Sequence, residues 1–234
     1  MLIGAEKHPP YERPPLSKQY LRGEPVDPYL RPAEFYAEQG IECRFGSEVT
    51  SVDAAAHRVH LDGGDDLPYD KVLVATGLRN RTLPGPALEG MYGLRTIDDA
   101  GRLREAIARA SRAVVVGMGF IGAEVTAAAR AAGVEVTVIE PQPGPVYSAL
   151  GPEGSAVVER IHREHGVTMR FGEGVAEVHG DARIEAVTTT SGHRIDCDLA
   201  VVGVGTIPQA EVVHGTGVTV DNGIVVDEYC RTGV

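Results

Sequence analysis

The chain is poor in cysteine and in aromatic side chains. Its 234 residues include three cysteines, no tryptophan and 5% aromatic residues. Cys43, Cys197 and Cys230 lie far apart and form neither a C-x-x-C pair nor a short metal-ligand spacing. This pattern argues against a metal site or a redox-active cysteine pair. It is typical of small buried side chains in a reducing compartment.

Long hydrophobic runs and an excess of positive charge are also missing. No apolar stretch reaches the roughly 18 residues that a membrane helix needs, and the first residues lack the pattern of a signal peptide. We therefore expect a cytoplasmic protein without a membrane partner. Lys and Arg number 22 against 33 Asp and Glu, a net charge of −11. Because so acidic a chain repels a polyanion at long range, nucleic-acid binding is excluded.

The remaining composition, 43% hydrophobic and 24% charged, indicates a globular protein of one or two domains. A Pro/Gly-rich stretch at residues 83–93 is typical of a domain boundary. Strands are predicted at residues 41–45, 48–53, 58–61, 71–75, 112–117 and 135–140, with further short strands between 168 and 226. Helices are predicted at residues 16–22, 32–39, 97–110, 121–132 and 152–165. Residues 71–75 are nearly all apolar, which predicts a strand buried on both faces.

One motif points to specific chemistry: Gly117, Gly119 and Gly122 form G-x-G-x-x-G. In a chain with 29 glycines a bare match is weak evidence. Here, however, a β-branched run precedes the motif and an alanine-rich segment follows it. The next predicted strand ends at Glu140, 18 residues after Gly122. That interval is close to the roughly 20 residues of a dinucleotide-binding βαβ unit.

Each part of this motif has a physical role. Gly117 permits the tight turn, Gly119 lets a pyrophosphate approach the backbone, and Gly122 lets the helix pack closely on the strand. The free N–H groups and the positive end of the helix dipole hold the phosphate charge. Glu140 accepts hydrogen bonds from the adenosine ribose and repels a 2′-phosphate, which favours NADH over NADPH. The alternative interpretation is a glycine-rich turn without a ligand.

Four blocks occur in the order of a known family. They are residues 11–18 (YERPPLSK), Ala75-Thr76-Gly77 with Arg79, residues 117–124 (GMGFIGAE), and residues 221–227 (DNGIVVD). With these blocks the chain resembles the FAD-dependent pyridine nucleotide-disulfide oxidoreductases. It is most similar to the ferredoxin reductase group that includes the putidaredoxin, rubredoxin and biphenyl-dioxygenase ferredoxin reductases. The resemblance covers essentially the whole chain.

The resemblance implies a three-layer α/β fold that binds FAD and NADH. A doubly wound NAD domain at residues 95–207 would be inserted into an incomplete FAD domain, made of residues 1–94 and 208–234. The FAD site would comprise Glu6, Pro15, Lys18, Val49, Thr76, Gly77 and Arg79. The NAD site would comprise Gly117, Gly119, Phe120, Ile121, Gly122, Glu140 and Gly205.

The resemblance also implies catalytic roles for Lys18 and Glu124, which would face each other. Because hydride transfer depends on positioning, Glu124 would orient the nicotinamide and Lys18 would counter charge on the reduced flavin. Without the resemblance, a solvated helix face and a polar helix start explain the two residues. Glutathione and lipoamide reductases carry a redox-active cysteine pair that this chain lacks. The implied electron acceptor is therefore an external iron–sulfur protein, a ferredoxin or rubredoxin.

Two features depart from the family pattern. The sequence starts within what resembles the second strand of the FAD domain, so the glycine loop for the FAD pyrophosphate is missing. It stops before the family's alanine-glycine-aspartate segment. We therefore expect an unpaired sheet edge, NADH binding, and weak or absent FAD binding. The main hypothesis is an NADH-dependent flavoprotein reductase. The alternatives are a catalytically inactive NADH-binding module and one half of a split enzyme. No metal site is expected, because His162 and His165 lack further ligands.

Overall fold

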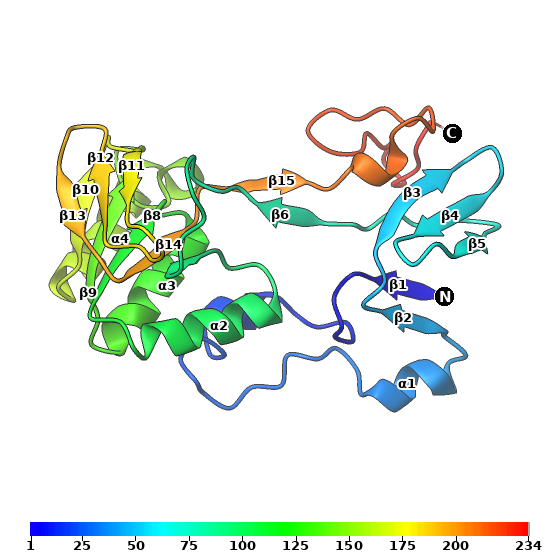
Figure 1. Ribbon diagram of the computed structural model, residues 1–234, viewed down its shortest axis with the longest axis horizontal. Coiled ribbons are helices and arrows are strands. Elements are labelled where there is room, and N and C mark those ends of the chain that lie inside the picture. The colour runs from blue at the N-terminus through cyan, green and yellow to red at the C-terminus, as the bar shows by residue number, and fades with distance from the viewer. Residues whose placement is uncertain (234) are drawn as a thin grey trace. The chain divides into compact units, whose positions relative to one another are not determined.

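The computed structural model describes residues 1–233, which divide into two compact units. The first unit contains Met1–Glu12, Tyr29–Arg79 and the segment from Thr206 onward. The second unit contains Arg13–Pro28 and Asn80–Gly205. Most helices and strands of both units are labelled in Figure 1. No helix within residues 1–233 is both long and apolar enough to cross a membrane.

A five-stranded parallel sheet forms the centre of the second unit, in the order β10-β9-β8-β14-β7. Its strands are β7 (Met91–Tyr92), β8 (Arg112–Val116), β9 (Glu135–Glu140), β10 (Thr168–Phe171) and β14 (Leu199–Val202). Val114 and Val115 of β8 are fully buried. This agrees with the β-branched run that predicted the strand, because a central parallel strand is covered on both faces.

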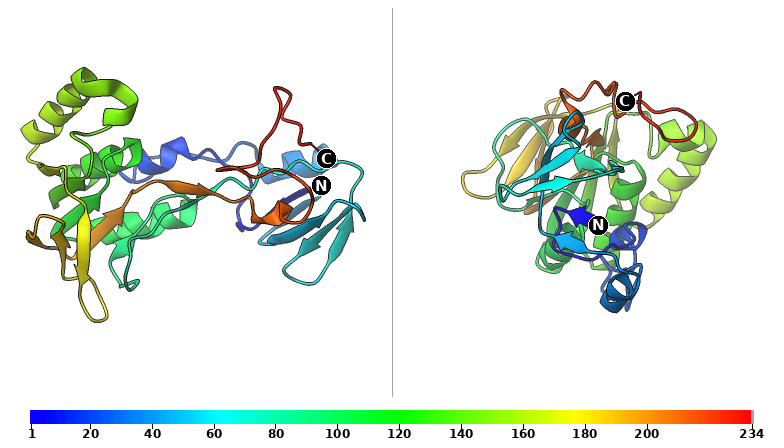
Figure 2. Two further views of the ribbon diagram at one scale, coloured as in Figure 1. Left: turned by 90° about the horizontal axis from the view of Figure 1, so that it is seen from above. Right: turned by 90° about the vertical axis from the view of Figure 1, so that its right-hand side faces the viewer.

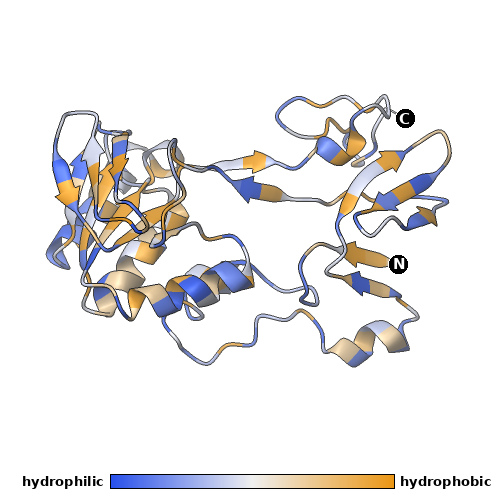
Figure 3. Ribbon diagram, viewed as in Figure 1, coloured by the Kyte–Doolittle hydropathy of each residue, from blue (hydrophilic) through white to orange (hydrophobic). Residues whose placement is uncertain are grey.

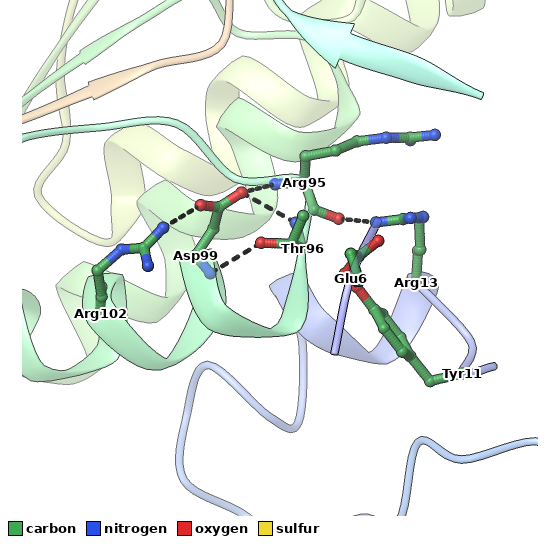
Figure 4. Close-up of polar contacts among 7 residues, drawn as sticks. All are labelled: Glu6, Tyr11, Arg13, Arg95, Thr96, Asp99 and Arg102. Carbon is green, nitrogen blue, oxygen red and sulfur yellow. Dashed lines mark hydrogen bonds and ion pairs between the residues drawn. The ribbon is translucent and has the colours of Figure 1, made fainter. Parts of the chain in front are cut away.

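Three helices belong to the second unit: α2 (Ile97–Ile107), α3 (Phe120–Ala131) and α4 (Tyr147–Glu164). A capping box starts α2, in which Asp99 N–H donates to Thr96 Oγ1 at 3.1 Å and Thr96 N–H donates to Asp99 Oδ2 at 2.9 Å (Figure 4). Hydrophobic and hydrophilic residues alternate along α2 (Figure 3), as expected for a helix with one buried face. Arg13 Nη1 donates to the Arg95 carbonyl at 2.5 Å, which ties the segment Arg13–Pro28 to the start of this helix.

The two faces of the parallel sheet are covered differently. A Cβ atom on Gly122 of α3 would lie 3.7 Å from Val115 Cγ1, so Val115 faces α3. Val114 and Val116 point the opposite way, because side chains alternate along a strand. They join a buried cluster with Val187 of an antiparallel meander. The meander consists of β11 (Val175–His179), β12 (Ala186–Thr189) and β13 (Arg194–Asp196). The second unit is therefore a three-layer α/β structure.

The first unit is built from small sheets. β1 (Leu2–Gly4) pairs in parallel with β2 (Cys43–Phe45). An antiparallel sheet contains β3 (Val49–Asp53), β4 (Arg58–Leu61) and β5 (Asp66–Pro68). β6 (Leu78–Asn80) and β15 (Thr206–Pro208) form a two-stranded ribbon, visible from two further sides in Figure 2. The short helix α1 (Ala33–Glu38) and the 3-10 turn η2 (Glu211–Val213) complete the unit.

The predicted strand at residues 71–75 is wrong. These residues form no strand, and Val72 and Leu73 are 42% and 83% exposed. An apolar run becomes a buried strand only where neighbouring strands pair with its backbone. No strand of the described residues 1–233 does so. The segment is thus an apolar stretch outside any sheet, so it is not itself the unpaired sheet edge that was expected.

Other elements differ from prediction mainly at their ends. In the segment 16–22, where a helix was predicted, residues 16–17 end the 3-10 helix η1 (Pro14–Ser17) and residues 18–22 form turns. α4 begins before its predicted start at residue 152, and its first turns are broken at Gly151, whose φ of 67° is not helical. After Pro208 the expected short strands are replaced by η2 and loops with an isolated bridge between Val220 and Ile224.

Candidate nucleotide-binding site

The turn between β8 and α3 requires glycine at two positions. Gly117 has a φ of +89°, and a Cβ atom there would collide with the Gly203 carbonyl oxygen. A Cβ atom on Gly122 would overlap the carbonyl oxygen of Gly117. Both contacts involve backbone atoms, which cannot move away as a flexible side chain can. Gly117 and Gly122 are therefore needed for the turn and the helix–strand packing, as the motif predicts.

Gly119 has a different environment. Its φ of −71° is ordinary for any residue, and a Cβ atom there would meet nothing within 4 Å. Gly119 is also the N-cap of α3 and provides no side-chain acceptor for the first N–H groups of the helix. Since those groups have no intrahelical partner, they can bind an anion. The neighbouring Phe120 and Ile121 are exposed, although both are large and apolar.

Glu140, the last residue of β9, lies against the same turn. Its side chain is buried, and its Oε2 accepts the Met118 N–H at 2.6 Å while Oε1 accepts the Gln142 N–H at 2.8 Å. A carboxylate offers about four acceptor positions. Two backbone donors therefore fix Glu140 and leave acceptor capacity for ribose hydroxyls.

A pocket of about 200 Å³ connects the turn with this carboxylate. It is lined by Met118, Gly119, Phe120, Glu140, Gln142, Gly144, Val146, Tyr147, Ser148 and Ala149. Val146 has a left-handed φ of 46°, which is costly for a β-branched residue. Its N–H donates to the Met118 carbonyl at 2.7 Å, and this hydrogen bond holds the far wall of the pocket against the glycine turn. The lining contains no lysine or arginine.

Lys18 and Glu124 come together in the second unit, 106 positions apart in sequence. Lys18 Nζ lies 2.9 Å from Glu124 Oε1 and 2.9 Å from Oε2. Ser17 Oγ donates to Glu124 Oε2 at 2.5 Å. Pro15 lies in η1 immediately before this pair, and its carbonyl accepts the Lys18 N–H at 3.1 Å. Glu124 is one turn into α3, so the pair adjoins the helix end that the glycine turn opens.

Gly205 follows β14, the neighbour of β8 in the sheet. Gly203 N–H donates to the Val116 carbonyl at 2.7 Å, which ties the end of β14 to the end of β8. The Gly205 carbonyl accepts the Arg81 N–H at 3.0 Å. Because β14 and β8 are parallel, their carboxyl ends lie at the same edge of the sheet. Gly205, which follows β14, therefore lies at the same edge as the glycine turn, which follows β8. This is the position where ligands bind to open α/β sheets.

The other predicted FAD residues lie in the first unit. Glu6 follows β1 and accepts the Tyr11 hydroxyl hydrogen bond (Figure 4). Val49 begins β3. Thr76 Oγ1 donates to the Gln209 carbonyl, while Gln209 Nε2 donates back to the Thr76 carbonyl at 2.8 Å.

Two further residues continue this contact between residues 76–79 and 209–211. Gly77 accepts the Gln209 N–H at 3.0 Å. Arg79 Nη1 pairs with Glu211 Oε1 at 2.5 Å. The contact therefore holds the segment that follows residues 71–75 to the start of η2.

The two units differ in how well they fit the nucleotides. The open side of Gly119, the buried Glu140 carboxylate and a pocket lining without a cation fit a nicotinamide adenine dinucleotide. The first unit fits FAD only in part. Glu6 supplies an acid after a parallel strand. However, among its described residues no helix reaches eight residues, since α1 has six and η2 has three. A pyrophosphate therefore finds no helix N-terminus there like that of α3.

Sequence reasoning did not identify Ser17, Gln209 or the backbone donor Met118 as site residues. Ser17 lies inside a block that resembles the family, but a single serine gives no signal of the carboxylate it will contact. Gln209 and Met118 act through tertiary pairings that no local pattern records.

Within residues 1–233 no three metal-binding side chains gather closely enough to hold an ion. Cys197 is buried as expected, whereas Cys43 is half-buried and Cys230 is exposed. Burial raises the pKa of the Cys197 thiol to about 12, and the negative charge of Asp198 adds to this effect. Cys197 is therefore an unreactive thiol.

Comparisons with known proteins agree with this geometry. The chain is 45% identical to rhodocoxin reductase of Rhodococcus erythropolis over 99% of its length and 55% of the relative. It is 38% identical to putidaredoxin reductase of Pseudomonas putida, over 99% of this chain and 57% of the relative. The chain thus spans between half and three-fifths of the length of these relatives.

Solved structures of reductases are also similar to this chain. A ferredoxin reductase from Rhodopseudomonas palustris superposes with a TM-score of 0.94 at 37% identity, over 98% of this chain and 58% of that one. The reductase in a covalent putidaredoxin reductase–putidaredoxin complex gives a TM-score of 0.94 at 36% identity, over 99% and 58%. The glycine turn, the acid at the end of β9 and a family match over residues 1–234 lead to one conclusion: the chain belongs to the pyridine nucleotide-disulphide oxidoreductase family.

Proposed function

We propose that the chain is the NADH-binding part of a flavoprotein reductase that passes electrons from NADH, through FAD, to a small iron–sulfur protein. The observation that carries the proposal is the pocket beside the glycine turn, where Gly119 is open and Glu140 is fixed. In this proposal residues 95–207 are the NAD domain. Residues 1–94 and 208–234 contribute to the FAD domain.

The proposed coenzyme is NADH rather than NADPH. The Glu140 carboxylate can accept hydrogen bonds from both ribose hydroxyls, while it repels the 2′-phosphate of NADPH. No lysine or arginine in the pocket lining offsets that repulsion. The N–H groups at Phe120 and Ile121 would bind the pyrophosphate at the start of α3. Gly205 would contact the dinucleotide from the end of β14.

Lys18 and Glu124 are proposed as the catalytic pair. Glu124 would orient the nicotinamide by accepting a hydrogen bond from its carboxamide, and Lys18, 2.9 Å from that carboxylate, would counter charge on a reduced flavin. A bound flavin supplies the ability to accept two electrons from NADH and to release them one at a time. Glu6, Pro15, Val49, Thr76, Gly77 and Arg79 are the residues proposed to line the FAD site.

The proposed electron acceptor is a ferredoxin or rubredoxin. Rhodocoxin reductase and putidaredoxin reductase are named for small carrier proteins, and one similar structure is a covalent complex with putidaredoxin. In this chain, Cys43, Cys197 and Cys230 are far apart in sequence. An external acceptor replaces the redox-active cysteine pair that other members of the family use.

A second candidate function is an NADH-binding module or one half of a split enzyme. It is favoured by the absence, in the described first unit, of a helix long enough to hold the FAD pyrophosphate. Under this alternative the second unit binds NADH, and flavin chemistry needs a further chain.

One experiment separates these candidates. The chain is titrated with NADH and with NADPH, and NADH-driven reduction of ferricyanide or cytochrome c is measured with and without added FAD. Turnover with FAD supports the reductase. NADH binding without turnover supports the module or the split enzyme. A chain that binds neither coenzyme refutes both.

A further inference from the structure

Ser17 is a buried residue whose hydroxyl contacts the proposed catalytic pair. Ser17 as a whole residue is 6% exposed, whereas the side chains of Lys18 and Glu124 are 41% and 28% exposed. The Ser17 Oγ donates to Glu124 Oε2 at 2.5 Å. A short bond to a charged acceptor is stronger than a bond between neutral groups. Glu124 is therefore held from the interior by a serine and from the surface by a lysine.

The contacts use the two oxygens of Glu124 unequally. Oε2 accepts from Ser17 and from Lys18, which fills its two lone-pair positions. Oε1 contacts Lys18 at 2.9 Å and keeps one acceptor position. The three donors of the Lys18 ammonium are also occupied, since it contacts both oxygens and donates to the Pro14 carbonyl at 3.1 Å. The unused acceptor position of the Glu124 carboxylate in this cluster is therefore on Oε1.

We infer that Ser17 is a positioning residue that makes the site select a nicotinamide ring carrying an N–H donor. By engaging Oε2, Ser17 fixes the rotation of the carboxylate and leaves Oε1 for the carboxamide N–H of the coenzyme. This inference rests on the proposed function, because it assigns the specificity of the same site. A site that hydrogen-bonds a donor of its ligand binds an analogue without that donor more weakly.

The position of Glu124 on α3 agrees with this role. Glu124 is four residues after Phe120, about 6 Å along a helix with a rise of 1.5 Å per residue. Helical side chains lean toward the N-terminus, so Glu124 leans toward the glycine turn. A dinucleotide whose pyrophosphate lies at that turn can therefore bring its nicotinamide to Glu124.

The test compares NADH with reduced 3-acetylpyridine adenine dinucleotide, in which a methyl ketone replaces the carboxamide and removes the N–H donor. Dissociation constants of both are measured by fluorescence titration of the chain. We expect the native chain to prefer NADH by about tenfold, the value of one well-placed hydrogen bond. In Ser17→Ala the preference should fall to about twofold, chiefly because NADH binds more weakly. Ser17→Thr keeps the hydroxyl and should restore the native preference.

The controls separate positioning from a purely structural role. Thr126→Val removes a different buried hydroxyl, which lies on α3 and has no hydrogen-bond partner in the described structure. This variant should leave the preference for NADH over the analogue unchanged. Thermal unfolding checks that each variant is folded. If Ser17→Ala does not fold, Ser17→Cys keeps the size of the side chain with a weaker donor and should show the same loss of preference.

The outcomes also distinguish a failure of this inference from a failure of the proposed function, NADH binding, on which it rests. A folded Ser17→Ala or Ser17→Cys variant that keeps the native preference overturns the role of Ser17 while leaving NADH binding intact. A folded Ser17→Thr variant without the native preference overturns it too. Failure of the native chain to bind NADH overturns both the inference and the proposed function.

Discussion

Replacing Gly119 by alanine should separate coenzyme binding from folding. The added methyl group meets nothing within 4 Å, and the backbone φ of −71° suits alanine. Alanine gains about 0.4–1 kcal/mol because the unfolded chain is less flexible. It loses a similar amount because alanine is a poorer N-cap than glycine. The free energy of unfolding should therefore change by less than about 0.5 kcal/mol.

Coenzyme affinity should respond strongly to the same change. In the proposed site the pyrophosphate approaches the backbone at Gly119, where the methyl group would stand. Displacing the phosphate loses at least one hydrogen bond to a charged group, about 1.5–3 kcal/mol, which corresponds to an NADH dissociation constant about 10- to 150-fold higher. NADH titration by fluorescence and urea unfolding measure the two effects on one protein sample.

Two other glycines calibrate this experiment. Gly101 lies inside α2, and a methyl group added there would meet nothing within 4 Å. Gly101→Ala should therefore stabilise the fold by about 0.5–1 kcal/mol and leave NADH affinity unchanged. Gly122→Ala forces a methyl group onto the Gly117 carbonyl and should unfold or strongly destabilise the chain. The reasoning is refuted if Gly119→Ala binds NADH as tightly as the native chain.

Three further predictions follow from single side chains. Glu140→Ala should weaken NADH binding by about 10- to 100-fold and reduce the preference over NADPH, measured by parallel titrations; unchanged affinity for both would exclude a ribose contact. Thr126→Val should raise the free energy of unfolding in urea by about 1 kcal/mol, because the Thr126 hydroxyl is buried without a partner; a loss of stability would contradict this. The pKa of the Cys197 thiol is about 12 in the folded chain, against 9.0 for an ordinary cysteine, so the folded state holds more protons between these values. The stability from this thiol is complete below pH 9 and is lost as the pH rises toward 12, and unfolding curves of Cys197→Ala should show a smaller loss over that range.

Local sequence patterns were sufficient to predict the βαβ unit, but they did not predict the contacts that its residues make with distant parts of the chain. The run before Gly117 and the acid at Glu140 lie within one continuous segment, so spacing alone predicts that they meet at one turn. The pairing of Lys18 with Glu124 joins residues 106 positions apart, and only the resemblance to a family could suggest it. Nothing in the sequence indicates that Ser17 is the third member of this cluster.

Residues 71–75 show why an apolar run is an incomplete prediction. Hydrophobic composition reports that a segment is suited to burial, whereas strand formation also requires hydrogen-bonding partners. β8 has partners on both sides, and its valines are buried. Residues 71–75 have a similar composition but no paired strand among the described residues, so Leu73 remains 83% exposed. The same sequence signal therefore gave opposite results in the two units.

The three glycines of the motif carry different kinds of information. Gly117 and Gly122 are fixed by backbone atoms of the turn itself, so they would be required whether or not a coenzyme binds. Gly119 has no such contact, so no clash within the fold requires glycine there. A match to G-x-G-x-x-G thus establishes a type of strand–helix turn, while evidence for a ligand rests on Gly119 and on the acid that faces it. Here Glu140 is that acid, and the Met118 N–H fixes its carboxylate at the pocket before any ribose arrives. Because this carboxylate needs no reorientation, discrimination against a 2′-phosphate should be present in the free protein rather than induced by the coenzyme.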